Sequence, residues 1–169
     1  VAFLVNECNA MKIEVLPPDI NESLENFTVV KEKQIRFGLA AVKNVGQNVV
    51  QAIVRERKDN GHFASISDFI ERVRDKDLNK KSLESLVKCG AMDKLGERGQ
   101  LLFNMESILV FSHEITKSKS NGQSSLFGGV AQGVSLRLQP SAPAAKKEKL
   151  AWEKELLGLY VSEHPIREF

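Results

Sequence analysis

The spacing of apolar residues changes character near residue 38 of this chain. Before that point, the segments 13–16, 27–30 and 34–37 are short and contain β-branched or aromatic residues, and Pro17-Pro18 ends the first of them. Beyond it, apolar residues recur at steps of three and four, which is the spacing of helices. The pattern predicts a mainly α fold with a small β-containing N-terminal segment, in which residues 27–37 form a hairpin.

Two short helices are predicted to meet at the break Asn44-Val45-Gly46. The apolar positions on both sides of this break have the spacing of two helices packed on each other: Leu39, Val42, Val45, Val49, Ala52 and Ile53. We expect Gly46 to adopt a positive φ, and the second helix to run from about residue 47 to about residue 58. The unit resembles a helix-hairpin-helix, in which N–H groups at the start of the second helix hold a phosphate. A helical hairpin that only packs would leave the same pattern.

Capping signals define the helices that follow. Ser65 and Asp68 have the spacing of a capping box, Asn79 is a suitable N-cap, and Gly90 stands where a left-handed C-cap would end the helix from Asn79. Residues 86–96 repeat the helix, glycine turn and apolar residue in weaker form, so we interpret them as a degenerate second hairpin. One longer amphipathic helix through residues 101–111 is expected to close the bundle.

The composition changes after residue 115. Residues 116–143 are rich in Ser, Gly, Gln and Pro and have no sustained periodicity, so a flexible linker is expected before helix returns at about residue 146. Gln123, Leu126 and Phe127 stand out in this segment, because an apolar pair in a polar linker is better explained as an anchor for a groove on a partner. Folding of the pair back onto the bundle is the alternative.

Charge and composition narrow the function only slightly. The net charge of +2 is small, so binding of nucleic acid would have to depend on local clusters of Lys and Arg. Basic residues do flank both hairpins: Lys43, Arg55, Arg57, Lys58, Lys76, Lys80, Lys81 and Lys88. The His and Cys residues show no metal-ligand or nucleophile spacing, so we expect neither a catalytic residue nor a metal site. No apolar run is long enough to cross a membrane, which favours a cytoplasmic protein. The start at Val1 suggests a piece of a longer chain.

Five collinear blocks carry a family resemblance. They cover residues 13–23, 36–43, 63–69, 83–93 and 155–165, and include Arg36-Phe37-Gly38-Leu39 and Glu163-His164-Pro165. Together they resemble the family of bacterial DNA polymerase III alpha subunits, the C-family replicative polymerases. The blocks span nearly the whole chain outside the expected linker, which makes the resemblance more specific than the hairpin alone.

The resemblance implies an organisation for the chain. Residues 1–37 would be the end of the fingers domain with short strands, and 38–115 a tandem helix-hairpin-helix domain. Residues 116–145 would be the flexible linker with a clamp-binding peptide, and 146–169 the start of the C-terminal region. The family is a DNA-directed DNA polymerase that uses Mg²⁺ held by palm aspartates, and these would lie before Val1. This piece is therefore expected to lack the catalytic residues and to need no cofactor of its own.

The resemblance also implies partners and site residues. The hairpin would grip double-stranded primer-template DNA through Lys43, Asn44, Val45, Gly46, Gln47 and Asn48. Gln123, Leu126 and Phe127 match the family's peptide for the sliding clamp, the beta subunit, and other subunits of the polymerase III holoenzyme are expected nearby. In one respect the chain departs from the family, because Asn44 replaces the first Gly of the usual Gly-hydrophobic-Gly turn. A helix-hairpin-helix module from a repair nuclease or helicase, and a purely structural connector, are the alternatives.

Overall fold

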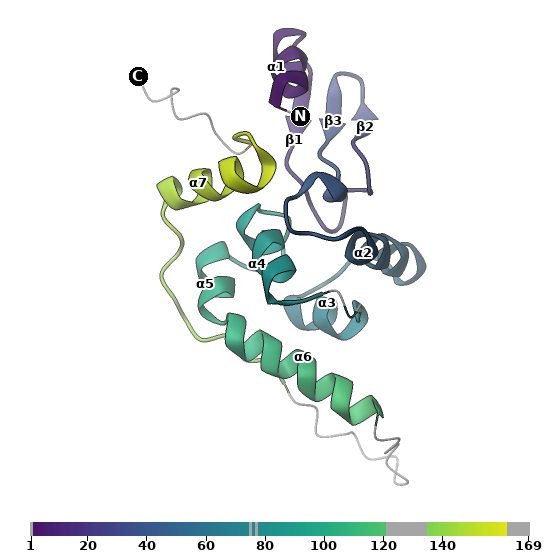
Figure 1. Cartoon of the computed structure of the whole chain (residues 1–169), viewed down its shortest axis with the longest axis vertical. Coiled ribbons are helices and arrows are strands. Elements are labelled where there is room, and N and C mark those ends of the chain that lie inside the picture. The colour runs from purple at the N-terminus through teal and green to yellow at the C-terminus, as the bar shows by residue number, and fades with distance from the viewer. Residues whose placement is uncertain (1, 75, 77, 121–134, 162–169) are drawn as a thin grey trace.

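The computed structural model describes residues 2–74, 76, 78–120 and 135–161 (Figure 1). These residues are mainly helical, with one small sheet. In chain order the elements are α1 (Ala2–Ala10), β1 (Glu14–Leu16), β2 (Thr28–Lys31), β3 (Gln34–Arg36), the 3₁₀ turn η1 (Leu39–Ala41), α2 (Gln47–Asn60), α3 (Ile66–Arg72), α4 (Lys80–Lys88), α5 (Arg98–Phe103), α6 (Met105–Ser120) and α7 (Lys146–Leu157). The predicted fold class is confirmed.

The sheet forms one end of the molecule, with strand order β1-β3-β2. β2 and β3 pair antiparallel with Val29 opposite Ile35, which confirms the predicted hairpin, and β1 adds in parallel to β3 with Val15 opposite Ile35. α1 packs on β1 (Figure 1). Residues 17–27 form the crossover segment that carries the chain from β1 to β2 on the other side of β3, and the hairpin then brings β3 back parallel to β1.

The crossover segment fastens the sheet to the helices. Asn21 donates from Nδ2 to the Phe63 carbonyl at 3.1 Å and accepts the Phe63 amide on Oδ1 at 2.8 Å. The amide of Ile20 donates to the Ala91 carbonyl at 3.0 Å, and the Ile20 side chain is fully buried. This segment without regular secondary structure is thus bonded to the loop between α2 and α3 and to the turn after α4.

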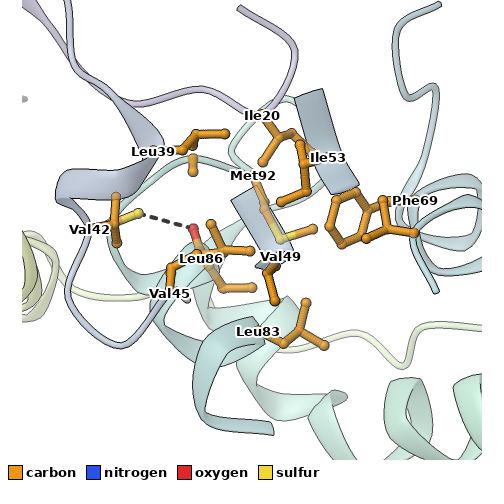
Figure 2. Close-up of a cluster of buried hydrophobic side chains, with 14 of the residues drawn as sticks. Ile20, Leu39, Val42, Val45, Val49, Ile53, Phe69, Leu83, Leu86 and Met92 are labelled. Atoms are coloured by element: carbon orange, nitrogen blue, oxygen red, sulfur yellow. Dashed lines mark hydrogen bonds between the residues drawn. The ribbon is translucent and has the colours of Figure 1, made fainter. Parts of the chain in front are cut away.

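The hydrophobic core lies between α2, α4 and the turn that precedes α2. Figure 2 shows side chains from these elements pointing toward one another: Leu39, Val42, Val45, Val49, Ile53, Leu83, Leu86 and Met92. Phe69 of α3 and Ile20 of the crossover complete the cluster (Figure 2). Residues before and after Asn44-Val45-Gly46 pack into this same core. The core therefore fixes the position of the turn before α2.

The predicted caps are present. The Ser65 hydroxyl accepts the Asp68 amide at 3.1 Å, and Asn79 Oδ1 accepts the Ser82 amide at 3.0 Å. Gly90 has φ +90° directly after α4, as a left-handed C-cap requires. α2 ends at Asn60 with Gly61 as its C-cap, close to the predicted boundary. These signals were readable because each depends on neighbours within a few residues.

The prediction of a helix before Asn44, as the first helix of the hairpin, is wrong. Only the 3₁₀ turn η1 forms there, because the chain becomes extended at Val42, with φ −77° and ψ 123°. The amides of Leu39 and Ala40 donate to the carbonyls of Leu24 and Glu25, each at 3.0 Å. The expectation for Gly46 is also wrong. Gly46 has φ −70°, and Asn44 takes the left-handed conformation instead, with φ 68°.

The single amphipathic helix expected through residues 101–111 is divided into α5 and α6 at Asn104. The Asn104 side chain donates to the Gln139 carbonyl at 3.0 Å and accepts the Gln139 amide at 2.8 Å. α6 then continues to Ser120, beyond the expected start of the linker. Residues 135–145 are extended and lie against α5 and α6. The division of the chain at residues 37, 115 and 145 stays a prediction.

Candidate nucleic-acid interface

The turn before α2 presents its polar residues to solvent and its apolar residue to the core. Val45 is 8% exposed and points into the cluster with Val42 and Val49 (Figure 2). The other predicted site residues are all exposed, namely Lys43, Asn44, Gly46, Gln47 and Asn48. The six predicted residues therefore occupy the turn before α2 and the first two residues of α2, and the buried Val45 anchors them to the core.

The N-terminus of α2 differs from those of its neighbours. Its N-cap residue is Gly46, which has no side chain to bond to the first N–H groups, and its first turn has no acidic residue. By contrast, α3, α4 and α5 are capped by Ser65, Asn79 and Glu97, and α7 has Glu148 in its first turn. A Cβ added at Gly46 would meet no atom within 4 Å. The positive end of the α2 dipole is thus open to an anion from outside.

Three contacts from different parts of the chain hold this turn in place. The Lys43 amide donates to the Leu156 carbonyl at 3.0 Å, and Asn44 Nδ2 donates to Ser85 Oγ at 3.4 Å. Gln47 Nε2 donates to Glu25 Oε1 at 2.9 Å, which places one carboxylate beside the start of α2. Sequence reasoning missed Glu25, Ser85 and Leu156, because no local signal marks partners so distant in the chain.

The second, weaker hairpin around Gly90 has a different role. Ala91 and Met92 are each 1% exposed, and a Cβ at Gly90 would collide with the guanidinium of Arg98. The N-terminus of α5 is also occupied, because the Glu97 carboxylate accepts the Gln100 amide at 3.0 Å. A carboxylate in this position excludes a phosphate. The second hairpin is therefore a packing element.

Arg98 is the centre of the buried polar contacts around that hairpin. It is 5% exposed and bonds to both carboxylate oxygens of Asp93 at 3.0 Å and to Glu153 Oε1 at 3.1 Å. Burial alone would lower the pKa of Arg98, but the two carboxylates outweigh it and raise that pKa. Arg98 stays charged and ties α5 to α7.

The basic residues that flank the hairpins divide into two groups. Some are engaged within the protein: Arg57 Nη1 donates to the Ile20 carbonyl at 2.6 Å, and Lys80 pairs with Glu106 at 2.6 Å. Burial lowers the pKa of Arg57. Others extend from the exposed surface, including Lys43, Arg55, Lys58 and Lys81. These exposed basic residues are spread over the turn before α2, the second half of α2 and the start of α4.

Within the described ranges, no group of three or more His, Cys, Asp or Glu side chains lies close enough to hold a metal ion. Gln123, Leu126 and Phe127 fall outside the described residues. Across the helices that the structure does describe, none has the length and apolarity to span a bilayer.

Comparison with known proteins places this geometry in a family. The model of the helix-hairpin-helix motif matches residues 12–101. The DNA polymerase III subunit alpha of Thermus aquaticus is 43% identical over 166 residues, and that of Deinococcus radiodurans is 42% identical over 172 residues. The same subunit of Mycobacterium tuberculosis is 43% identical over 172 residues.

These alignments cover 98%, 99% and 98% of this chain, respectively, so the resemblance seen in the five sequence blocks is confirmed. The chain spans only 13% of the length of the first two relatives and 14% of the third. The uncapped turn before α2 lies inside the matched motif. The chain belongs to the helix-hairpin-helix family, and nearly all of it is similar to one segment of the bacterial DNA polymerase III alpha subunits.

Proposed function

We propose that this chain is the part of a polymerase III alpha subunit that holds duplex DNA, without reading its sequence, at the turn before α2. The observation that supports this most strongly is the N-terminus of α2, where Gly46 leaves an exposed and uncapped helix end. A phosphate placed there gains hydrogen bonds from backbone N–H groups and the favourable field of the helix dipole. Such contacts fix a protein on the duplex but carry no sequence information.

The side chains around the turn fit this role. Lys43 is exposed beside the helix end and adds a positive charge for the same or the next phosphate. Asn44 and Asn48 are exposed and belong to a residue type that contacts phosphate and sugar, and Asn44 Nδ2 also donates to Ser85 Oγ within the protein. Glu25 opposes binding through its negative charge, so the affinity is expected to be weak and to depend strongly on salt.

The comparisons favour a polymerase over the alternatives. A helix-hairpin-helix module taken from a repair nuclease or helicase would share the hairpin, but the similarity to polymerase subunits extends over 98% of this chain in the relative from Thermus aquaticus. A purely structural connector would not need an uncapped helix end. The second hairpin, whose helix end Glu97 caps, shows what such a packing element looks like in this same fold.

Fluorescence anisotropy of labelled primer-template DNA at low salt tests the proposal. Lys43→Glu should weaken binding and reduce the slope of log affinity against log salt concentration by about 1. Lys31→Glu is the matched control, because Lys31 is exposed on the sheet and the variant has the same change in charge. Equal loss in the two variants, or no DNA binding by the wild type at low salt, would refute the assignment of the turn.

The proposal includes binding of the sliding clamp by the peptide with Gln123, Leu126 and Phe127. The support is the match to the family's clamp peptide and the similarity of the chain to polymerase subunits. Binding to the clamp, which encircles DNA, keeps the primer end at high effective concentration near the protein. Even weak binding of DNA by the turn would then suffice for processive synthesis. Pull-down with the clamp should be lost when Leu126 and Phe127 are both changed to Ala, and undiminished capture would refute the peptide.

In this proposal the polymerase activity, its Mg²⁺ and the contacts with further holoenzyme subunits belong to the longer cytoplasmic protein. This chain contributes the hold on DNA and the clamp peptide, with no cofactor of its own. A primer-extension assay on the chain alone should give no product. Extension of the primer by the chain alone would show that catalytic residues lie within it, contrary to the proposal.

A further inference from the structure

The C-terminal helix α7 lies directly against the turn that we assign to DNA. The contact is a backbone hydrogen bond from the Lys43 amide to the Leu156 carbonyl at 3.0 Å. α7 lies beside α4 (Figure 1), where Leu156 and Leu157 are 5% and 4% exposed. An element at the other end of the sequence thus fixes the backbone of a residue in the proposed interface.

The Leu156 carbonyl is available because α7 ends where it does. Gly158 adopts the left-handed conformation, with φ 79° and ψ 4°, and its amide closes the helix on the Lys154 carbonyl at 3.1 Å. If the helix continued, the amide four residues beyond Leu156 would be its partner. Termination at Gly158 leaves that carbonyl to accept a donor from elsewhere, and Lys43 supplies the donor.

The position of α7 is set by a buried ion pair. Glu153 is fully buried, with Oε1 accepting from Arg98 Nη1 at 3.1 Å and Oε2 accepting the Val161 amide at 3.1 Å. Arg98 also donates to the Lys88 carbonyl at 3.2 Å, at the end of α4. Because a buried charge without its partner is very unfavourable, this pair strongly disfavours other placements of α7 on the bundle.

We propose that α7 is a positioning element for the DNA-contacting turn, with Glu153 and Gly158 as its positioning residues. Glu153 holds the helix on Arg98, and Gly158 ends it so that the Leu156 carbonyl meets the Lys43 amide. The inference rests on the proposed function and extends it to regulation: a displacement of α7, by whatever contacts it or the residues that follow, loosens the turn and weakens the hold on DNA.

Gly158→Ala tests this inference, because it strains the left-handed cap without a clash, since a Cβ there meets no atom within 4 Å. Hydrogen exchange measured by NMR should become about tenfold faster at the Lys43 amide, relative to the Ile53 amide in α2. DNA binding measured by anisotropy should weaken in parallel. Gly158→Asn should largely restore both, because Asn tolerates the left-handed region.

Gly61→Ala is the control for general strain, because Gly61 also has a positive φ and open space but caps the far end of α2. It should leave the relative exchange at Lys43 and the DNA affinity unchanged. Wild-type exchange at Lys43 in Gly158→Ala, or faster exchange with unaltered DNA binding, would overturn the inference. If the wild type binds no DNA, the proposed function fails, while the exchange comparison still decides whether α7 fixes the turn.

Discussion

Substitution of Gly46 should separate the stability of the fold from the hold on DNA. Gly46 has φ −70° and ψ 154°, a conformation open to any residue, and a Cβ there meets no atom within 4 Å. In Gly46→Ala the folded state is destabilised, because Ala is a poorer N-cap than Gly. The unfolded state is destabilised as well, because Ala has fewer backbone conformations than Gly, so the two effects on the free energy of unfolding oppose each other. The free energy of unfolding should therefore change by less than about 1 kcal/mol.

The effect on DNA should be much larger. The new methyl group would project into the space where a phosphate approaches the first N–H groups of α2. Loss of one hydrogen bond to a charged group costs about 1.5–3 kcal/mol, which corresponds to roughly tenfold weaker binding or more. Urea unfolding and anisotropy at one salt concentration give the two quantities. Equal DNA affinity in Gly46→Ala and the wild type would refute the idea that phosphate contacts this helix end.

Serine gives a stricter form of the same test. In Gly46→Ser the hydroxyl should cap α2 and compete with the phosphate, so the protein should be at least as stable and yet bind DNA less well. Ala145→Ser is the matched control, since Ala145 is the N-cap of α7 and also lacks a side-chain cap. Both variants should retain or gain stability, but only Gly46→Ser should lose DNA affinity. Equal DNA affinity in the two variants would contradict the account.

Three further predictions concern the rest of the fold. Gly90→Ala should lower the free energy of unfolding in urea by about 2–4 kcal/mol, because it forces a Cβ to a positive φ and into the Arg98 guanidinium; unchanged stability would refute this role. Only Cys8 should react with a thiol reagent in the native protein, as shown by mass spectrometry, because complete burial raises the pKa of Cys89 to about 12. Burial would raise the pKa of Glu97, but its carboxylate accepts hydrogen bonds from backbone amides and from Lys149, and these lower that pKa. The ionised Glu97 therefore stabilises the fold near neutral pH, and this contribution is lost as pH falls through the lowered pKa. In Glu97→Gln the free energy of unfolding should depend less on pH in the acid range.

The elements that could be predicted from the sequence are those with local causes. The caps at Ser65, Asn79 and Gly90 depend on hydrogen bonds or backbone conformations within a few residues, and all three are present. The hairpin of β2 and β3 follows in the same way from two short β-prone segments that lie close together in the chain. Burial of Val45 agrees with its place in the apolar series, which is also a local pattern.

The elements that were missed have causes far away in the chain. α5 and α6 divide at Asn104, whose side chain bonds to Gln139, and the amides of Leu39 and Ala40 in η1 bond to the carbonyls of residues 24 and 25. Asn44 takes the left-handed conformation that was expected of Gly46, in a turn anchored by Ser85 and by the Leu156 carbonyl. No pattern within a short window reports such partners, so the sequence alone could not reveal how the turn is held.

Mapping of DNA contacts by NMR tests the central claim most directly. Titration of the ¹⁵N-labelled chain with primer-template duplex should shift the amide signals of Gly46 and Gln47 first. The amides around Gly96, before the capped end of α5, should stay in place. Shifts confined to other surfaces, or equal shifts at both hairpins, would contradict the assignment of the α2 N-terminus as the site that holds the phosphate backbone.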